Sequence, residues 1–310
     1  MKWWEREGPK QGPRPNPDFF WLLSGGIDSV AAFLLTKDAL RENFRKSPVA
    51  VYLDTRVGLP ANRLYVERLC DQYDVQLWSL RTHEKFEDRV AERGKYRDRD
   101  DAGAPGPARH SDVQNELKGR QREKLANLAD DALFISGIRA GESEKRASQP
   151  KGERTRRGKY VKPVYSLSKK ECAEIILQHE DCPINPGWLW NHFTDCGCLA
   201  NGDPSELDSV EDRFPWFAQR MREYEEATKA ESVRSVLGWG GLTAEEQRVR
   251  EQGHTQTTLN LCGVGCQRKR DPPIKRAFRA RLDGATPEVA IAELYEPEPV
   301  PLATDGGSDR

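Results

Sequence analysis

The sequence predicts an α/β fold built on a doubly wound, mostly parallel sheet. Between residues 19 and 135, short apolar runs alternate with stretches whose apolar residues recur at helical spacing. Strands that alternate with helices in this way are typical of a parallel sheet covered by helices. Several of the strand-like runs end in polar residues, and ligands of such sheets bind beyond the carboxyl ends of the strands. We therefore expect these polar ends to converge on one crevice.

The individual elements follow from the spacing of apolar residues. Strands are expected where β-branched and aromatic residues cluster, and helices where apolar residues lie three or four positions apart. In chain order we predict strands at 19–23, 49–53, 75–80, 132–135 and 161–165, and helices at 28–40, 61–72, 113–129, 168–179, 207–228 and 243–252. The charged segments at 84–112 and 144–160 are predicted to be loops.

Changes in composition suggest four parts. Residues 1–17 are rich in proline and glycine and are expected to form a surface arm. Residues 18–182 hold the alternating elements and form the predicted nucleotide-binding domain. Residues 183–291 bring tryptophans and paired cysteines and form a smaller C-terminal region. Residues 292–310 are rich in Pro, Glu, Asp and Gly, which is typical of a disordered tail.

Charge and hydropathy exclude some classes of protein. The chain has 49 basic and 50 acidic residues, so any binding of a polyanion must come from local clusters. No apolar run approaches the ~20 residues that a membrane helix needs. No secretory leader is recognised, so we expect a cytoplasmic protein without a membrane partner. In that compartment seven cysteines indicate metal or thiol chemistry rather than disulfides.

The first strand runs directly into a glycine turn and then into a helix. Glycines let backbone N–H groups approach an anion, and the helix dipole favours negative charge at this end. A carboxylate at the start of the helix can hold a divalent cation against phosphate. The alternative is a tight turn without a ligand. The predicted nucleotide-binding residues of this loop are Ser24, Gly25, Gly26, Ile27, Asp28 and Ser29, with Asp28 also catalytic.

The pattern Ser-Gly-Gly-x-Asp-Ser resembles the signature of PP-loop ATP pyrophosphatases, which split ATP between its α and β phosphates. Residues 137–146 resemble the Gly-x-Arg-x-x-Glu-Ser-x-x-Arg element of phosphoadenosine phosphosulfate (PAPS) reductases. Residues 53–60 partly resemble that family's Asp-Thr-Gly…Pro-Glu-Thr element, but Arg56 replaces the glycine and Ala61-Asn62 replaces Glu-Thr. Residues 162–171 and 184–186 resemble two further family segments. The resemblance covers about residues 18–200 and implies bound ATP or PAPS with Mg²⁺.

This resemblance gives roles to residues beyond the loop. Gly137 and Arg139 follow the fourth strand, where an arginine could bind a phosphate bidentately and take part in catalysis. Glu142 would orient that arginine or bind ribose; the alternative is a solvated surface pair. Asp54, at the end of the second strand, would be a second acid for Mg²⁺ or adenosine, or else a helix N-cap.

The chain also departs from the true reductases. Those enzymes carry Glu-Cys-Gly-x-His, whose thiol attacks sulfur, whereas here the last cysteine is followed by Gln-Arg-Lys-Arg. The chain is more similar to the ATP-pyrophosphatase component of DNA phosphorothioation systems, which carries an iron–sulfur cluster. Two close cysteine pairs could hold a [4Fe–4S] cluster, a zinc ion or no metal. The predicted ligands are Cys196, Cys198, Cys262 and Cys266.

Two basic runs, at residues 145–159 and 268–281, stand out in a nearly neutral chain. A run of one sign is often just a solvated face, but two of them also fit a polyanionic substrate such as DNA or tRNA. Trp188, Trp190 and Phe193 could stack on a base, although core packing explains them as well. The predicted phosphate patch comprises Arg154, Arg156, Arg157, Arg268, Lys269 and Arg270.

Together these observations predict an enzyme that adenylates an acceptor oxygen with ATP–Mg²⁺ and releases pyrophosphate. Sulfur from a donor such as a cysteine desulfurase would then displace AMP. The sequence leaves the acceptor open among DNA, tRNA and a small molecule. Two alternatives also stay open: a sulfonucleotide reductase that uses an external thiol, and a nucleotide-sensing subunit of a modification or defence complex.

Overall fold

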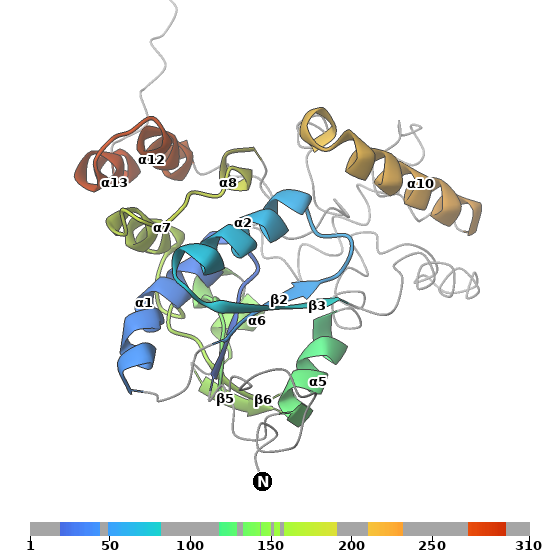
Figure 1. Ribbon diagram of the computed structural model, residues 1–310, viewed down its shortest axis with the longest axis horizontal. Helices are drawn as coiled ribbons and strands as arrows, with labels where there is room; N and C mark the ends of the chain where they lie inside the picture. Colours follow the sequence, from blue (N-terminus) through green and yellow to red (C-terminus); the bar gives the residue numbers. More distant parts are fainter. Residues whose placement is uncertain are drawn as a thin grey trace, which may run out of the picture.

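The computed structural model describes nine stretches of the chain, drawn in colour in Figure 1. They are residues 19–43, 49–81, 118–128, 133–142, 144–149, 152–155, 158–190, 210–231 and 272–295. The expected arm at 1–17, the loop at 84–112, the helix at 243–252 and the four paired cysteines lie outside these ranges. Within them, none of the helices is long and apolar enough to cross a membrane.

The sheet confirms the predicted α/β architecture. Its six strands lie in the order β3-β2-β1-β4-β6-β5. The first five of these are parallel neighbours, and β5 runs antiparallel to β6 at one edge. The strands are β1 (Phe19–Leu22), β2 (Val49–Asp54), β3 (Gln76–Arg81), β4 (Leu133–Ile135), β5 (Gly152–Thr155) and β6 (Gly158–Val161). Because β1 pairs with β2 on one side and β4 on the other, the winding reverses at β1.

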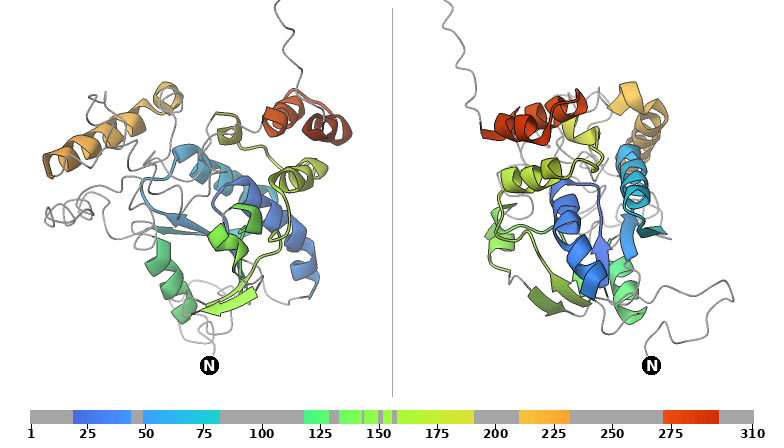
Figure 2. Two further views of the ribbon diagram at one scale, coloured as in Figure 1. Left: turned by 180° about the vertical axis from the view of Figure 1, so that it is seen from behind. Right: turned by 60° about the vertical axis from the view of Figure 1, so that its left-hand side comes forward.

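Helices cover both faces of this sheet (Figures 1 and 2). On one face α1, α2 and α7 share a core with the strands, and α5 packs on the other face. The longer helices are α1 (Ile27–Asn43), α2 (Pro60–Gln72), α5 (Arg120–Leu128), α7 (Lys169–Gln178), α10 (Pro215–Glu231), α12 (Pro272–Leu282) and α13 (Pro287–Tyr295). Short helical segments are η4 (Ala140–Glu142), α6 (Glu144–Ala147) and α8 (Gly187–Trp190).

Successive side chains of strand β1 point to opposite faces of the sheet and so contribute to both cores. Phe19 and Trp21 point to the α1 face, whereas Phe20 between them points to the α5 face. All three are at most 1% exposed. Phe20 stacks on Phe134 of β4 with ring centroids 5.4 Å apart. A strand buried on both faces reads as a continuous apolar run, which is why the sequence predicts it so clearly.

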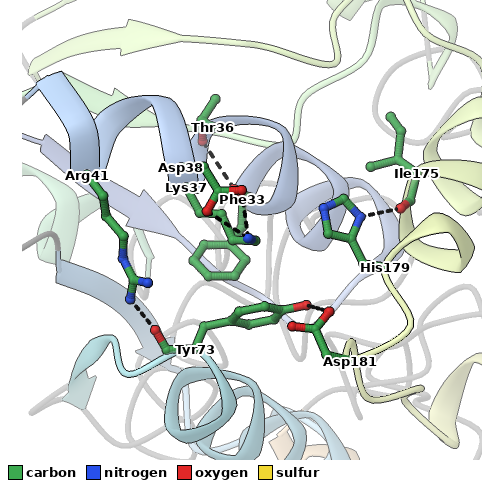
Figure 3. Close-up of polar contacts among 9 residues, drawn as sticks. All are labelled: Phe33, Thr36, Lys37, Asp38, Arg41, Tyr73, Ile175, His179 and Asp181. Carbon is green, nitrogen blue, oxygen red and sulfur yellow. Dashed lines mark hydrogen bonds and ion pairs between the residues drawn. The ribbon is translucent and has the colours of Figure 1, made fainter.

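Polar contacts join the ends of α1, α2 and α7 on the first face (Figure 3). The Tyr73 hydroxyl, just after α2, donates to the Asp181 carboxylate at 2.9 Å. The buried Lys37 ammonium of α1 lies 4.9 Å from the centre of the Tyr73 ring. Arg41 of α1 donates to the Tyr73 carbonyl. These contacts fix the three helices relative to one another.

The structure corrects several predicted boundaries. The strand expected at 161–165 ends at Val161, because residues 163–166 form a turn in which Tyr165 N donates to Lys162 O at 3.1 Å. The loop expected at 144–160 contains α6 and the β5–β6 hairpin. Residues 292–295 of the expected tail belong to α13. Described parts of the expected C-terminal region, including Trp188 and Phe278, share the core of α1 and α7.

Candidate nucleotide site

The loop between β1 and α1 adopts a compact turn around two serines. Gly25 has a φ of +79°, in the left-handed region that favours glycine. The Ser29 hydroxyl donates to Gly26 O at 2.8 Å and accepts from Ser24 N at 3.3 Å. The first amides of α1 have no intrahelical acceptor, so this end of the helix can receive an anion. We call residues 24–29 the PP-loop.

Buried side chains hold the PP-loop on the side that faces the core. Asn185 Nδ2 and Trp188 Nε1 both donate to the Gly25 carbonyl, at 3.0 and 2.9 Å. Asn185 Nδ2 also donates to Asn62 Oδ1 at 3.0 Å. The sequence analysis assigned no role in the site to Asn62. Trp188 is 4% exposed and packs on Phe278, which supports its core reading rather than base stacking.

Gly137 brings the end of β4 against the start of α1. A Cβ atom added at Gly137 would lie 2.4 Å from Ser29 N and 2.5 Å from the Asp28 carbonyl carbon. Both neighbours are backbone atoms, so no side-chain movement could make room. Glycine is therefore required here by the close approach of two backbones, and this approach places Arg139 beside the PP-loop.

Asp28 and Arg139 form an ion pair at the mouth of α1. Arg139 Nε lies 2.8 Å from Asp28 Oδ1, and the two side chains are 10% and 18% exposed. The contact lacks hydrogen-bond geometry, and neither atom has another hydrogen-bond partner among the described residues. A carboxylate oxygen with unused acceptor capacity and a guanidinium lie side by side where the helix amides point. This donor set fits a divalent cation bound together with a phosphate.

Cys172 of α7 lies beside this pair. It is fully buried. Burial, followed by the negative charge of Asp28, raises the pKa of the Cys172 thiol to about 12. Cys70 and Cys182 are also buried, and burial raises the pKa of each thiol to about 12. These three cysteines are therefore neutral structural thiols at physiological pH.

Glu142 contacts backbone and a second arginine. Its Oε2 atom accepts from the Arg139 amide at 3.1 Å and pairs with the Arg146 guanidinium. The Tyr165 carbonyl accepts from the Ala140 amide at 2.8 Å. Glu142 thus stabilises the turn that carries Arg139. Its contact with ribose stays a prediction.

Asp54 ends β2 and is engaged on both oxygens. Its Oδ1 atom accepts from the Arg56 amide at 2.8 Å, and its Oδ2 atom accepts from Arg81 Nε at 3.0 Å. Arg56 has a φ of +63°, a left-handed conformation that is uncommon for a residue other than glycine. Asp54 thus holds a turn at the strand end next to the PP-loop. Its contact with Mg²⁺ or adenosine stays a prediction.

Most of the remaining predicted site residues lie in parts of the chain that the structure does not describe. The cysteines at 196, 198, 262 and 266 lie outside the described residues, as do Arg156, Arg157 and residues 268–270. Among the described residues, no three His, Cys, Asp or Glu side chains lie close enough to hold a metal ion. In α12, Lys275 donates to Leu189 O at 3.2 Å and Arg276 pairs with Glu293 at 3.1 Å. Part of the second basic run therefore has structural contacts.

A comparison with models of protein families identifies one family. The model of the phosphoadenosine phosphosulfate reductase domain matches residues 18–204, well over half of the chain. A crystal structure of PAPS reductase from Candida auris, in a phosphate complex, shares 14% sequence identity. The match covers 55% of this chain and 76% of that chain, with a TM-score of 0.38. No curated protein matches the sequence. On the extent of the domain match, the protein belongs to the PAPS reductase domain family.

Proposed function

We propose that the protein binds ATP–Mg²⁺ in the PP-loop crevice, adenylates an acceptor and releases pyrophosphate. The observation that carries this proposal is the Asp28–Arg139 pair, 2.8 Å apart at the amino end of α1. A carboxylate and a guanidinium in contact at a helix N-terminus provide groups for both a metal ion and a phosphate. The same crevice could take PAPS, so the reaction and not the presence of the site has to be tested.

In the proposed reaction an acceptor oxygen attacks the α-phosphorus of ATP. The bond to the β-phosphate breaks, and pyrophosphate leaves with the bonding electrons. The N–H groups of Gly26 and Ile27 would stabilise the charge that develops on the leaving group, and Arg139 would move from Asp28 to a phosphate oxygen. Asp28 would hold Mg²⁺, which supplies charge neutralisation when bound. A sulfur nucleophile from a donor such as a cysteine desulfurase would then displace AMP from the acceptor.

We propose nucleic acid as the acceptor class, with the β5–β6 hairpin as its contact. The register of this hairpin pairs Arg154 with Lys159 directly across the two strands. Arg156 and Arg157 add two cations between them in sequence. Binding of DNA or tRNA should then weaken steeply with salt, and a triple Arg154, Arg156 and Arg157 to Ala variant should flatten this dependence.

The proposal also includes a [4Fe–4S] cluster held by the two cysteine pairs, at positions 196 and 198 and at 262 and 266. Its support is the donor set, since four thiolates suit iron–sulfur clusters and also zinc. Anaerobically purified protein should be brown and should lose its colour when any of these cysteines is changed. Colourless protein that holds stoichiometric zinc would show that these cysteines bind a structural zinc ion and not a cluster.

Sulfonucleotide reduction is the second candidate, and the family match over residues 18–204 favours it. In that case one thiol of an external dithiol would attack the sulfur of PAPS, break its bond to the phosphate oxygen and displace adenosine 3′,5′-bisphosphate. The second thiol would then attack the resulting S-sulfonate, release sulfite and leave a disulfide. A non-catalytic nucleotide-sensing subunit would bind a nucleotide without turnover. Sulfite release from PAPS with a dithiol protein therefore identifies a reductase, pyrophosphate release from ATP identifies the proposed activity, and binding alone identifies a sensor.

The decisive variant is Asp28→Ala, with Asp38→Ala as its matched control on the same helix. Asp38 is 64% exposed at its side chain and pairs with Lys37, away from the PP-loop. We expect Asp28→Ala to abolish pyrophosphate release and Asp38→Ala to retain it, at similar melting temperatures. More than about a tenth of wild-type activity in Asp28→Ala would exclude a metal role worth even ~1.4 kcal/mol.

A further inference from the structure

The Gly25 carbonyl joins the PP-loop to buried side chains of the core. It accepts from Asn185 Nδ2 at 3.0 Å and from Trp188 Nε1 at 2.9 Å, so both of its lone pairs are used. The peptide bond is planar and trans, so the N–H of Gly26 points opposite to this carbonyl. Two donors on the buried side therefore fix the direction of an amide on the other side. That amide, which donates to Ser24 Oγ at the long distance of 3.4 Å in this structure, is one of those assigned above to the leaving pyrophosphate.

Asn185 is itself held in a single orientation. It is fully buried. Its Nδ2 group donates to Gly25 O and Asn62 Oδ1, and its Oδ1 atom accepts from Gly187 N at 2.9 Å. Rotating the amide by 180° would lose all three contacts in a place that water does not reach. Burial of an unpaired amide is costly, so the observed orientation is strongly preferred.

Asn62 supports this arrangement from the first turn of α2. It is also fully buried; its Oδ1 atom accepts from Asn185 Nδ2, and its Nδ2 atom has no hydrogen-bond partner among the described residues. A Cβ atom on Gly25 would lie 3.3 Å from Asn62 Cβ and from Asn62 O. The residue at position 62 thus sets how closely α2 approaches the PP-loop. This is also one of the positions where the chain departs from the resembling family element, which has threonine there.

We infer that Asn62, Asn185 and Trp188 form a positioning clamp that orients the Gly26 amide toward bound pyrophosphate. Asn62 orients Asn185, and Asn185 with Trp188 fixes the Gly25 carbonyl. The inference rests on the proposed function for its ligand, because the clamp matters to catalysis only if a polyphosphate binds the PP-loop. None of the three residues touches the ligand in this scheme. They act through the backbone of Gly25.

Two variants test the clamp while keeping the core filled. Trp188→Phe removes the Nε1 donor but keeps a ring against Tyr65 and Phe278. Asn62→Leu removes the acceptor for Asn185 with a side chain of similar size. The matched control is Thr36→Val, because Thr36 Oγ1 accepts from Trp21 Nε1 at 2.9 Å in the same core without contacting the PP-loop. Each clamp variant loses one buried hydrogen bond, whereas Thr36→Val also loses the bond that Thr36 Oγ1 donates to Ala32 O at 2.8 Å, so the control removes at least as many contacts.

The first measurement is hydrogen exchange of the peptide that spans residues 19–30 in the ligand-free protein. We expect exchange at the PP-loop amides to rise about tenfold in Trp188→Phe and Asn62→Leu, and to stay at the wild-type rate in Thr36→Val. Asn62→Thr, which restores an acceptor, should bring the rate back toward wild type. Unchanged exchange in both clamp variants would overturn the inference.

The second measurement separates positioning from general damage. The dissociation constant of pyrophosphate with Mg²⁺ should rise about tenfold in the clamp variants, while that of adenosine changes less than about twofold. Equal loss of both ligands, or loss in Thr36→Val as well, would mean a merely structural role and would overturn the inference. If wild-type protein binds neither ATP nor pyrophosphate, the proposed function fails, and the exchange experiment still decides whether the clamp holds the loop.

Discussion

The turns that follow β1 and β2 share a left-handed backbone conformation at one position but have different residues there. Each needs a left-handed residue shortly after its strand: Gly25 has a φ of +79° and Arg56 a φ of +63°. After β1 the residue is glycine, and the backbone is free to offer its amides to a ligand. After β2 an arginine takes the same backbone region, and its amide donates to Asp54 Oδ1 at 2.8 Å. The comparison shows that the turn after β2 is left-handed although Arg56 stands where the resembling family element has glycine.

The largest effect is expected from Gly137→Ala, which tests whether the turn after β1 depends on the close approach of the segment that follows β4. The new Cβ would lie 2.4 Å from Ser29 N, so the backbones of β4 and α1 must separate. We expect a loss of about 3 kcal/mol in the free energy of unfolding and loss of nucleotide binding. Chemical denaturation and ATP titration measure the two effects. Wild-type stability would show that the approach of the two backbones is looser than described.

Gly25→Ala should have the next largest effect. The left-handed backbone disfavours alanine, and the new methyl group would press on Asn62 at 3.3 Å. The expected loss is about 2 kcal/mol in the free energy of unfolding. Pyrophosphate affinity should fall as well, because the adjacent amide is displaced. A variant that melts like wild type and binds pyrophosphate normally would contradict the role given to this residue.

At position 56 we expect the same preference for glycine over alanine, although the natural residue there is arginine. Arg56→Gly and Arg56→Ala both remove the guanidinium, so their difference isolates the backbone. We expect the glycine variant to be more stable than the alanine variant by about 1 kcal/mol, since only alanine is strained at a φ of +63°. Urea unfolding of the two variants measures this difference in the free energy of unfolding. Equal stabilities would mean that this turn relaxes when the arginine is removed, unlike the turn at Gly25.

The smallest effect is expected from Arg81→Met, which breaks the ion pair with Asp54. Arg81 is 56% exposed at its side chain, so solvent screens much of the attraction. The free energy of unfolding should fall by less than about 1 kcal/mol, and less again at high salt. A larger loss would indicate that Asp54 depends on this arginine to hold the β2 turn.

The sequence analysis located the parts of the fold that have strong local patterns. β1 and β2 were found because they are buried on both faces and read as continuous apolar runs. The β5–β6 hairpin was missed, because β5 reads Gly-Glu-Arg-Thr and an edge strand needs little apolar surface. In the site, Asp28 and Arg139 were found through contiguous motifs. The contact of Asn62 with Asn185 spans 123 positions, and no local pattern encodes it.

The packing of α12 and α13 bears on where an independently folding unit ends. Phe278 of α12 lies against Trp188 with ring centroids 4.7 Å apart, and Leu294 of α13 is buried in the core that contains Ile176 of α7. A fragment cut at residue 204, where the family match ends, would leave the apolar side of α7 and the indole that holds Gly25 uncovered. The end of the family match and the end of the folding unit therefore differ: the nucleotide loop is stabilised by helices that begin at Pro272, well beyond residue 204.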